Sequence, residues 1–158
     1  MSASTATAVI ASPVGPIELV ADEDALLGLT IRPDAVPGGN VEAHPVLRET
    51  ARQLAGYFSG TRRAFALPLA PLSSPRGEVL RNGIASIPYG ETLSYGALAN
   101  IVESAPRAVG QACRRNPFPI IIPCHRVTSS AGPEHYSGGH GVDTKTWLNR
   151  FEQQHKET

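Results

Sequence analysis

The stretch Ile120-Ile121-Ile122-Pro123-Cys124-His125-Arg126-Val127 places a thiol and an imidazole side by side, directly after a short, strongly apolar run. Three consecutive β-branched isoleucines between prolines predict a buried strand, which Pro123 ends because it lacks an amide donor. Cys124 is then expected on a turn at the edge of a rigid core. An ordinary cysteine pKa is roughly 8.5, so a nucleophilic Cys124 needs the base and the positive charge that His125 and Arg126 can supply. The alternative is a small buried core residue, which is the usual state of a free cysteine.

Length and cysteine usage narrow the class of protein. A chain of 158 residues can bury roughly two-thirds of its unfolded surface, as one domain or as two small ones. With two cysteines, Cys113 and Cys124, and no secretory leader or long apolar run, the sequence predicts a soluble protein of the cytoplasm. The cysteines and histidines lack the paired short spacings of structural zinc, so we expect neither a metal nor a cofactor.

Charge is unevenly distributed along the chain although the formal net charge is zero. Residues 1–60 hold seven acidic residues against three arginines, whereas residues 61–158 hold eleven lysines and arginines against seven acidic residues. Between residues 104 and 133 there is no acidic residue, and four arginines stand there: Arg107, Arg114, Arg115 and Arg126. Such a cluster is typical of a phosphate-binding surface, but an ordinary solvated basic face would have the same composition.

Hydrophobic patterning predicts an α/β N-terminal module, a small antiparallel sheet plus a helix, over residues 1–70. Apolar or alternating runs at 9–11, 17–21 and 26–31 predict a meander, and residues 1–7 are expected to fray. A near-helical spacing predicts a helix over 44–58, and 65–69 is expected to form a further strand.

Residues 71–158 predict a mainly α C-terminal domain that follows a Pro/Ser-rich linker. Ser94 or Thr92 can cap one helix, and Pro106 fits the first turn of the next. The expected helices are 78–86, 95–102, 106–115 and 144–153. Two short helices joined by a tight turn predict a helix-turn-helix-like arrangement.

Several short motifs accompany the cysteine in a fixed order. They are Ile87-Pro88-Tyr89-Gly90, Ser94-Tyr95, Arg107-Ala108-Val109-Gly110, Asn116-Pro117, Pro123-Cys124-His125-Arg126-Val127, Tyr136-Ser137-Gly138-Gly139, Lys145 and Glu152. From about residue 75 to 152 this order resembles the O6-alkylguanine-DNA alkyltransferase family. The resemblance implies a ribonuclease H-like module at 1–70 and a winged-helix-like DNA-binding and catalytic domain at 71–158.

The resemblance implies DNA repair by direct reversal. The alkyl group of O6-alkylguanine, and less efficiently of O4-alkylthymine, would move irreversibly to Cys124, once per molecule and without a cofactor. A base inside a duplex must first be extruded into a pocket. In this picture His125 is the base acting through a water, Glu152 orients it, Tyr95 donates a proton to the leaving guanine, and Asn116 pins the turn that carries the thiol.

The binding residues implied by the resemblance and by the basic cluster form two sets. Arg107 would enter the base stack, and the remaining DNA contacts are expected from Ala108, Gly110, Arg114, Arg115, Tyr95 and Arg126. The guanine edge would be read by the carbonyls of Cys124 and Val127, by Ser137 and by the loop at Gly138. The expected partner is double-stranded DNA containing O6-alkylguanine, bound by a monomer with no membrane association.

The sequence departs from the family pattern at Pro75, Leu80, His135 and His140, and these changes bear on helix packing and substrate range. Cys113 is expected to be a packing residue. One alternative function is an alkyltransferase-like lesion-recognition protein that binds without transfer, although such relatives usually replace the cysteine. Another is a thiol hydrolase using Cys124 and His125, which would leave the arginine and tyrosine motifs without roles.

Overall fold

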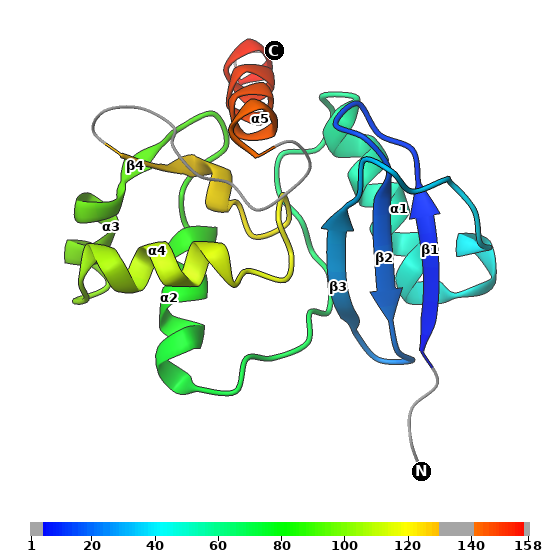
Figure 1. Cartoon of the computed structure of the whole chain (residues 1–158), viewed down its shortest axis with the longest axis horizontal. Helices are drawn as coiled ribbons and strands as arrows, with labels where there is room; N and C mark the ends of the chain where they lie inside the picture. Colours follow the sequence, from blue (N-terminus) through cyan, green and yellow to red (C-terminus); the bar gives the residue numbers. More distant parts are fainter. Residues whose placement is uncertain (1–4, 130–140, 157–158) are drawn as a thin grey trace. The chain divides into compact units, whose positions relative to one another are not determined.

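The computed structural model describes residues 5–129 and 141–156. The chain divides into two compact units, Met1–Ala70 and Pro71–Thr158. Figure 1 labels the α-helices of both units and the strands β1 to β4. None of the helices in the described ranges is long and apolar enough to cross a membrane.

The N-terminal unit is a three-stranded antiparallel sheet with one main helix. The strands β1 (Ala6–Ile10), β2 (Ile17–Ala21) and β3 (Leu26–Ile31) pair in the order β1-β2-β3. Helix α1 (Pro45–Phe58) contacts all three strands and follows a short 3-10 turn, η1 (Val41–Ala43). Alternate residues of β2 are buried, as the period-two geometry of a half-buried strand requires.

Two expectations for this unit are wrong in detail. Strand β1 already begins at Ala6, so only the first few residues precede the sheet. Residues 65–69 form no strand: Leu69 makes a single parallel bridge with Leu26, whose amide donates to the carbonyl of Pro68 at 2.7 Å. Prolines 68 and 71 lack amide donors, so the ladder cannot extend.

The C-terminal unit is mainly helical and confirms the predicted fold class. Its long elements are the helices α2 (Pro75–Ala85), α3 (Tyr95–Ile101), α4 (Pro106–Arg114) and α5 (Val142–His155). Helices α2, α3 and α4 pack against one another, and α3 and α4 form the helix-turn-helix-like pair. Ser94 caps α3 by accepting a hydrogen bond from the amide of Ala97 at 3.0 Å, while Pro106 occupies the first turn of α4.

The structure contains a short parallel pairing of two strands that the sequence did not predict. Strand β4 (Leu93–Ser94) pairs with β5 (Val127–Thr128), opposing Leu93 to Val127. The pairing joins the start of α3 to the strand that directly follows the 3-10 turn η2 (Cys124–Arg126), in which the cysteine lies. Tyr95 and Cys124 therefore lie close to the two ends of one rigid connection.

The predicted strand at the three isoleucines is wrong, although its burial is right. Ile120, Ile121 and Ile122 are at most 8% exposed, but the backbone turns: the amide of Ile122 donates to the carbonyl of Phe118 at 2.9 Å. Ile120 has a φ of 77°, a left-handed conformation that is unusual for a β-branched residue. Prolines 117, 119 and 123 remove amide donors on both sides of the three isoleucines, so this segment cannot pair as a strand.

Candidate active site

Cys124 opens the 3-10 turn η2 and is only 4% exposed. Asn116, just beyond the end of α4, holds this turn: its Nδ2 donates to the carbonyl of Ile122 at 2.8 Å, and its Oδ1 accepts from the amide of Phe118 at 2.9 Å. The amide of Cys124 in turn donates to the carbonyl of Ile122 at 2.7 Å. The structure thus gives Asn116 the geometry of a residue that pins the thiol-bearing turn.

The environment of the Cys124 thiol combines opposing influences. Burial raises its pKa, while a hydrogen bond with the Asn116 side chain and the nearby positive charge of Lys145 lower it. Burial has the largest effect, so the resting group is a thiol. Nucleophilic attack from this site therefore requires a base that removes the proton.

His125 and Glu152 form a fully buried pair beside the cysteine. Nε2 of His125 lies 2.7 Å from Oε2 of Glu152, and the two side chains are 0% and 1% exposed. Because a carboxylate only accepts, Nε2 carries the proton and Nδ1 of a neutral ring has a free lone pair. Nδ1 is buried and has no hydrogen-bond partner among the residues that the structure describes.

The protonation state of this pair follows from its surroundings. Burial lowers the pKa of His125 more strongly than Glu152 raises it, so the imidazole is neutral at pH 7. Burial alone would raise the pKa of Glu152, but hydrogen bonds from His125 and Arg126 and the positive charge of Arg126 hold it well below its usual range. The result is a neutral imidazole oriented by an ionised carboxylate.

Arg126 is the main correction to the sequence-based site. We expected it to contribute to an exposed phosphate-binding cluster, but the residue is 6% exposed. Its Nε and Nη2 donate to Glu152 at 2.8 and 3.0 Å, and its Nη1 donates to the carbonyl of Ile87 at 2.7 Å. The expected exposure is therefore wrong, because the guanidinium is buried and engaged with the carboxylate 26 residues further along the chain.

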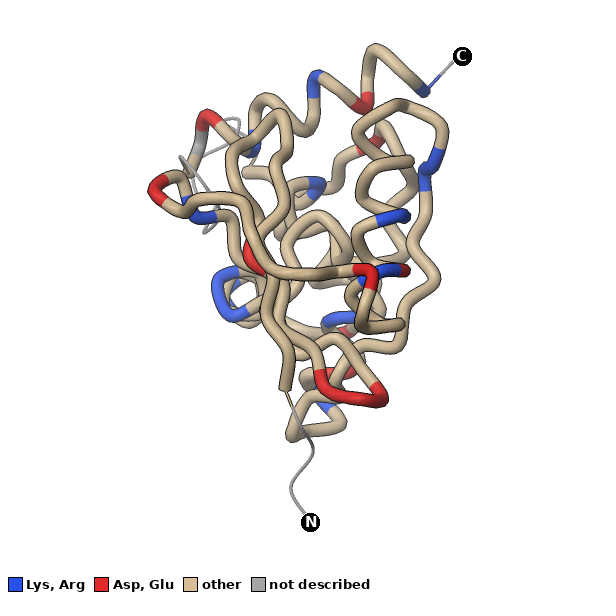
Figure 2. The backbone as a smooth tube through the Cα atoms, turned by 90° about the vertical axis from the view of Figure 1, so that its right-hand side faces the viewer, with Lys and Arg blue, Asp and Glu red and all other residues tan. Residues whose placement is uncertain are grey.

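The remaining arginines of the cluster are exposed on and just after α4. Arg107, Arg114 and Arg115 are all exposed, whereas Val109 on the same helix is buried. Figure 2 shows where basic and acidic residues lie along the backbone. A Cβ atom added at Gly110 would lie 4.0 Å from Cε1 of Tyr95, so this glycine brings α4 close to the tyrosine ring.

Tyr95 and Lys145 belong to the same neighbourhood as the thiol. Tyr95 begins α3 and is half-buried, and Nζ of Lys145 lies 5.7 Å from the centre of its ring. Lys145 on α5 is fully buried, a state that an ammonium group adopts only when compensated. The sequence singled out Lys145 by its place in the motif order, but nothing local in the sequence indicated its burial.

The structure also brings in residues that the sequence analysis did not name as part of the site. Asn149 Nδ2 donates to the carbonyl of His125 at 2.9 Å, and the amide of Gly90 donates to Glu152 Oε1 at 3.1 Å. Asn149 lies three residues before Glu152 on α5, so the helical spacing places both on one face. This spacing could have identified Asn149 from the sequence. Nothing in the sequence indicated that the carbonyl of Ile87 accepts a hydrogen bond from Arg126.

Ser137 and Gly138, with the departures at His135 and His140, lie outside the described residues. Val127 is fully buried in β5.

Cys113 is half-buried on α4, where burial and the neighbouring Cys124 raise its pKa to about 12. Across residues 5–129 and 141–156, no group of three or more His, Cys, Asp or Glu side chains could hold a metal ion.

Comparisons with known proteins identify relatives over nearly the whole chain. Residues 6–71 match the family model of the 6-O-methylguanine DNA methyltransferase ribonuclease-like domain, and residues 77–154 match the model of its DNA binding domain. The methylated-DNA–protein-cysteine methyltransferase of Methanosarcina acetivorans is 39% identical over 152 residues, which cover 92% of this chain and 96% of that protein. The constitutive methylated-DNA–protein-cysteine methyltransferase of Bacillus subtilis is 33% identical, covering 89% and 91%.

Solved structures give the same result. The crystal structure of the Mycobacterium tuberculosis O6-methylguanine methyltransferase has a TM-score of 0.81 and 30% sequence identity, covering 96% of this chain and 94% of that one. A crystal structure of the Mycobacterium tuberculosis protein OGT in complex with DNA has a TM-score of 0.80 and 29% identity, covering 94% and 93%. The motif order, the fold and these matches agree, and the chain belongs to the 6-O-methylguanine DNA methyltransferase family.

Proposed function

We propose that this protein repairs DNA by direct reversal, as a methylated-DNA–[protein]-cysteine S-methyltransferase. It transfers the methyl or another alkyl group from O6 of guanine, and less efficiently from O4 of thymine, to Cys124. The observation that carries the proposal is the buried Cys124 beside a neutral His125 that Glu152 orients at 2.7 Å. A nucleophile, a base and an orienting carboxylate in this order suit displacement by a thiolate.

The reaction is a displacement at the alkyl carbon. The Cys124 proton passes through a water to Nδ1 of His125, and the sulfur then forms a bond to the alkyl carbon. The bond between that carbon and O6 breaks, its electron pair goes to the guanine, and the guanine takes a proton from the Tyr95 hydroxyl. Asn116 holds the turn, and the thioether product is stable, so each molecule acts once.

The DNA partner is a duplex that contains O6-alkylguanine. Arg107 enters the base stack as the damaged nucleotide is extruded into the pocket. Arg114 and Arg115 are exposed and able to contact phosphates, while the small residues Ala108 and Gly110 let the backbone approach closely.

The two units of the chain have different roles. Residues 71–158 carry the DNA-binding and catalytic residues, and residues 1–70 form the ribonuclease H-like module. The carbonyls of Cys124 and Val127, with Ser137 and Gly138, read the guanine edge. The protein acts as a monomer in the cytoplasm.

The recognition-only alternative is not favoured, because Cys124 is present with a base and an orienting carboxylate. A thiol hydrolase is disfavoured because it would leave the exposed Arg107 and the placement of Tyr95 near α4 without a purpose.

A stoichiometric transfer assay tests the proposal. Purified protein is mixed with duplex DNA whose O6-methylguanine carries a labelled methyl group, and protein-bound label is counted over time. We expect label to saturate at one methyl per molecule, with none bound to Cys124→Ser. Cys113→Ser is the matched control and should transfer as the wild type does. Repeated turnover, or equal labelling of Cys124→Ser, would contradict the proposal.

A further inference from the structure

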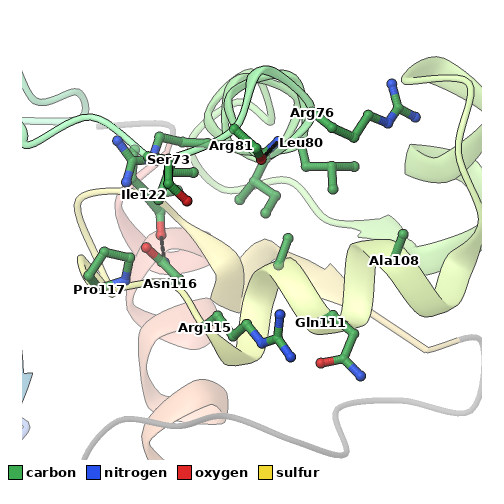
Figure 3. A pocket seen from close by; sticks show the side chains of 15 residues that line it. Ser73, Arg76, Leu80, Arg81, Ala108, Gln111, Arg115, Asn116, Pro117 and Ile122 are labelled. Atoms are coloured by element: carbon green, nitrogen blue, oxygen red, sulfur yellow. Dashed lines mark hydrogen bonds between the residues drawn. The ribbon is translucent and has the colours of Figure 1, made fainter.

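A hollow of about 430 Å³ lies in the C-terminal unit between α2 and α4. Figure 3 shows α2 along one side and α4 along the other, with Asn116, Pro117 and Ile122 at one end and Ala108 toward the opposite end. Such a volume is within the range of small-molecule sites. Leu80, one of the positions where the sequence departs from the family pattern, lines the hollow.

The lining combines an apolar wall with cationic side chains. The wall is built from aliphatic side chains: Leu72, Leu80, Ile84, Ala108, Ala112 and Ile122. All of its charged residues are arginines, Arg76, Arg81 and Arg115, and no acidic residue of the described chain lines it. A ligand that matches this lining has an apolar body and a negative charge.

The three arginines differ in their availability. Arg76 Nη2 donates to the carbonyls of Val102 and Glu103, at the end of α3. Arg81 is 8% exposed, with its guanidinium 5.3 Å from the centre of the Phe118 ring. Arg115 is exposed at the rim and makes no ion pair with any residue that the structure describes. Arg115 is therefore the cation that can bind an anion.

The hollow shares Ala108 and Arg115 with the proposed DNA contacts but lies on a different face of α4 from Arg107 and Arg114. At about 100° of rotation per residue, Arg107 and Arg114 lie within roughly 20° of each other around the helix, whereas Arg115 lies roughly 80° from Arg107. Ala108, Gln111 and Ala112, at helical spacing, share the Arg115 face and line the hollow. A ligand bound there leaves the Arg107 and Arg114 face open.

The hollow also adjoins the back of the thiol-bearing turn. Asn116 and Ile122 both line it, and they are joined by the 2.8 Å hydrogen bond that holds this turn. We propose that this hollow is a binding site for a small organic anion with an apolar body, which lies between α2 and α4 with its anionic group at Arg115. The site is separate from the thiol and does not depend on methyl transfer.

A direct binding measurement with a defined probe tests the proposal. The full-length protein is titrated with 2-naphthalenesulfonate, followed by probe fluorescence, and with the uncharged 2-naphthylmethanol as a comparison. We expect saturable binding of one sulfonate per molecule and about tenfold weaker binding of the alcohol, because a charge-assisted contact is lost. Arg115→Gln should weaken sulfonate binding by about tenfold. Arg114→Gln removes the same charge from the other face and should not.

Two further measurements separate this site from other occupants. Ala112→Leu fills the hollow and should abolish binding, with circular dichroism confirming that the variant is folded. Undamaged duplex DNA, held through Arg107 and Arg114, should bind together with the probe and leave Arg115 to the probe. Displacement of the probe by DNA would assign the hollow to the DNA interface and overturn the proposal. Equal effects of Arg114→Gln and Arg115→Gln, or undiminished binding to a folded Ala112→Leu variant, would also overturn it.

Discussion

Replacing Arg126 by methionine tests whether this arginine serves the buried site or the DNA surface. The guanidinium makes three hydrogen bonds, two to Glu152 and one to the carbonyl of Ile87. Removing one partner of a buried ion pair typically costs about 3–5 kcal/mol. Since Glu152 keeps its bonds to His125 and Gly90, we expect a loss of about 3 kcal/mol, the lower end of that range.

Urea unfolding followed by Trp147 fluorescence measures this loss, because Trp147 is the only tryptophan and lies in α5. The matched control is Arg114→Met on the exposed face of α4, which should change the free energy of unfolding by less than about 0.5 kcal/mol. DNA affinity is then measured at several salt concentrations. A lost phosphate contact reduces the slope of log K against log salt by about one. We expect that reduction for Arg114→Met and not for Arg126→Met.

The opposite pattern would assign Arg126 to the DNA surface. If Arg126→Met were as stable as the wild type and bound DNA with a smaller salt dependence, Arg126 would be a phosphate contact. The burial and the ion pair with Glu152 would then not describe its role.

Three further predictions concern pH, the active-site turn and helix packing. Burial lowers the pKa of His125, so below pH ~6.5 the unfolded state binds more protons than the folded state. The free energy of unfolding should therefore fall as the pH decreases below that value, and should not depend on His125 above it. Urea unfolding should show a shallower decline for His125→Asn. Asn116→Ala removes both hydrogen bonds that pin the turn and should slow single-turnover transfer by about 100-fold; an unchanged rate would count against this role. A Cβ at Gly83 would lie 2.5 Å from Val102 Cγ1, so Gly83→Ala should destabilise the protein by about 1–3 kcal/mol, whereas Gly96→Ala, with nothing within 4 Å, should not; equal effects would contradict the packing.

The sequence predicted the elements whose patterns are local and repeated. The bounds of β2 and β3 agree with the alternation of apolar residues, and α1 begins and ends within a residue of the expected helix. Ser94 as a cap and Pro106 at a first turn were readable because capping depends on neighbours in the chain.

The elements that were missed or wrongly predicted have a common physical cause. Their structure depends on residues other than those whose pattern was used for the prediction. The pairing of β4 with β5 is two residues long and joins segments 34 positions apart, Leu93 with Val127, so it leaves no periodicity to read. The isoleucine run was read from its hydrophobicity, but flanking prolines determine that it turns rather than pairs.

The candidate site shows the same division. Cys124, His125 and Glu152 were identified from motif order, and the structure places them together. Arg126 was assigned to the surface because charge patterning cannot show that its partner is a carboxylate 26 residues away. The burial of Lys145 could not be predicted either, because it depends on residues that are distant in the sequence.

Mass spectrometry of the protein after reaction shows whether a methyl group moves from the DNA to Cys124. The protein is incubated with duplex DNA containing one O6-methylguanine, and the intact chain and its Cys124 peptide are then weighed. We predict the gain of one CH2 unit, located on Cys124, with guanine restored in the DNA. A chain of unchanged mass that still binds the damaged duplex, or a methyl group located on Cys113, would show that Cys124 is not the acceptor.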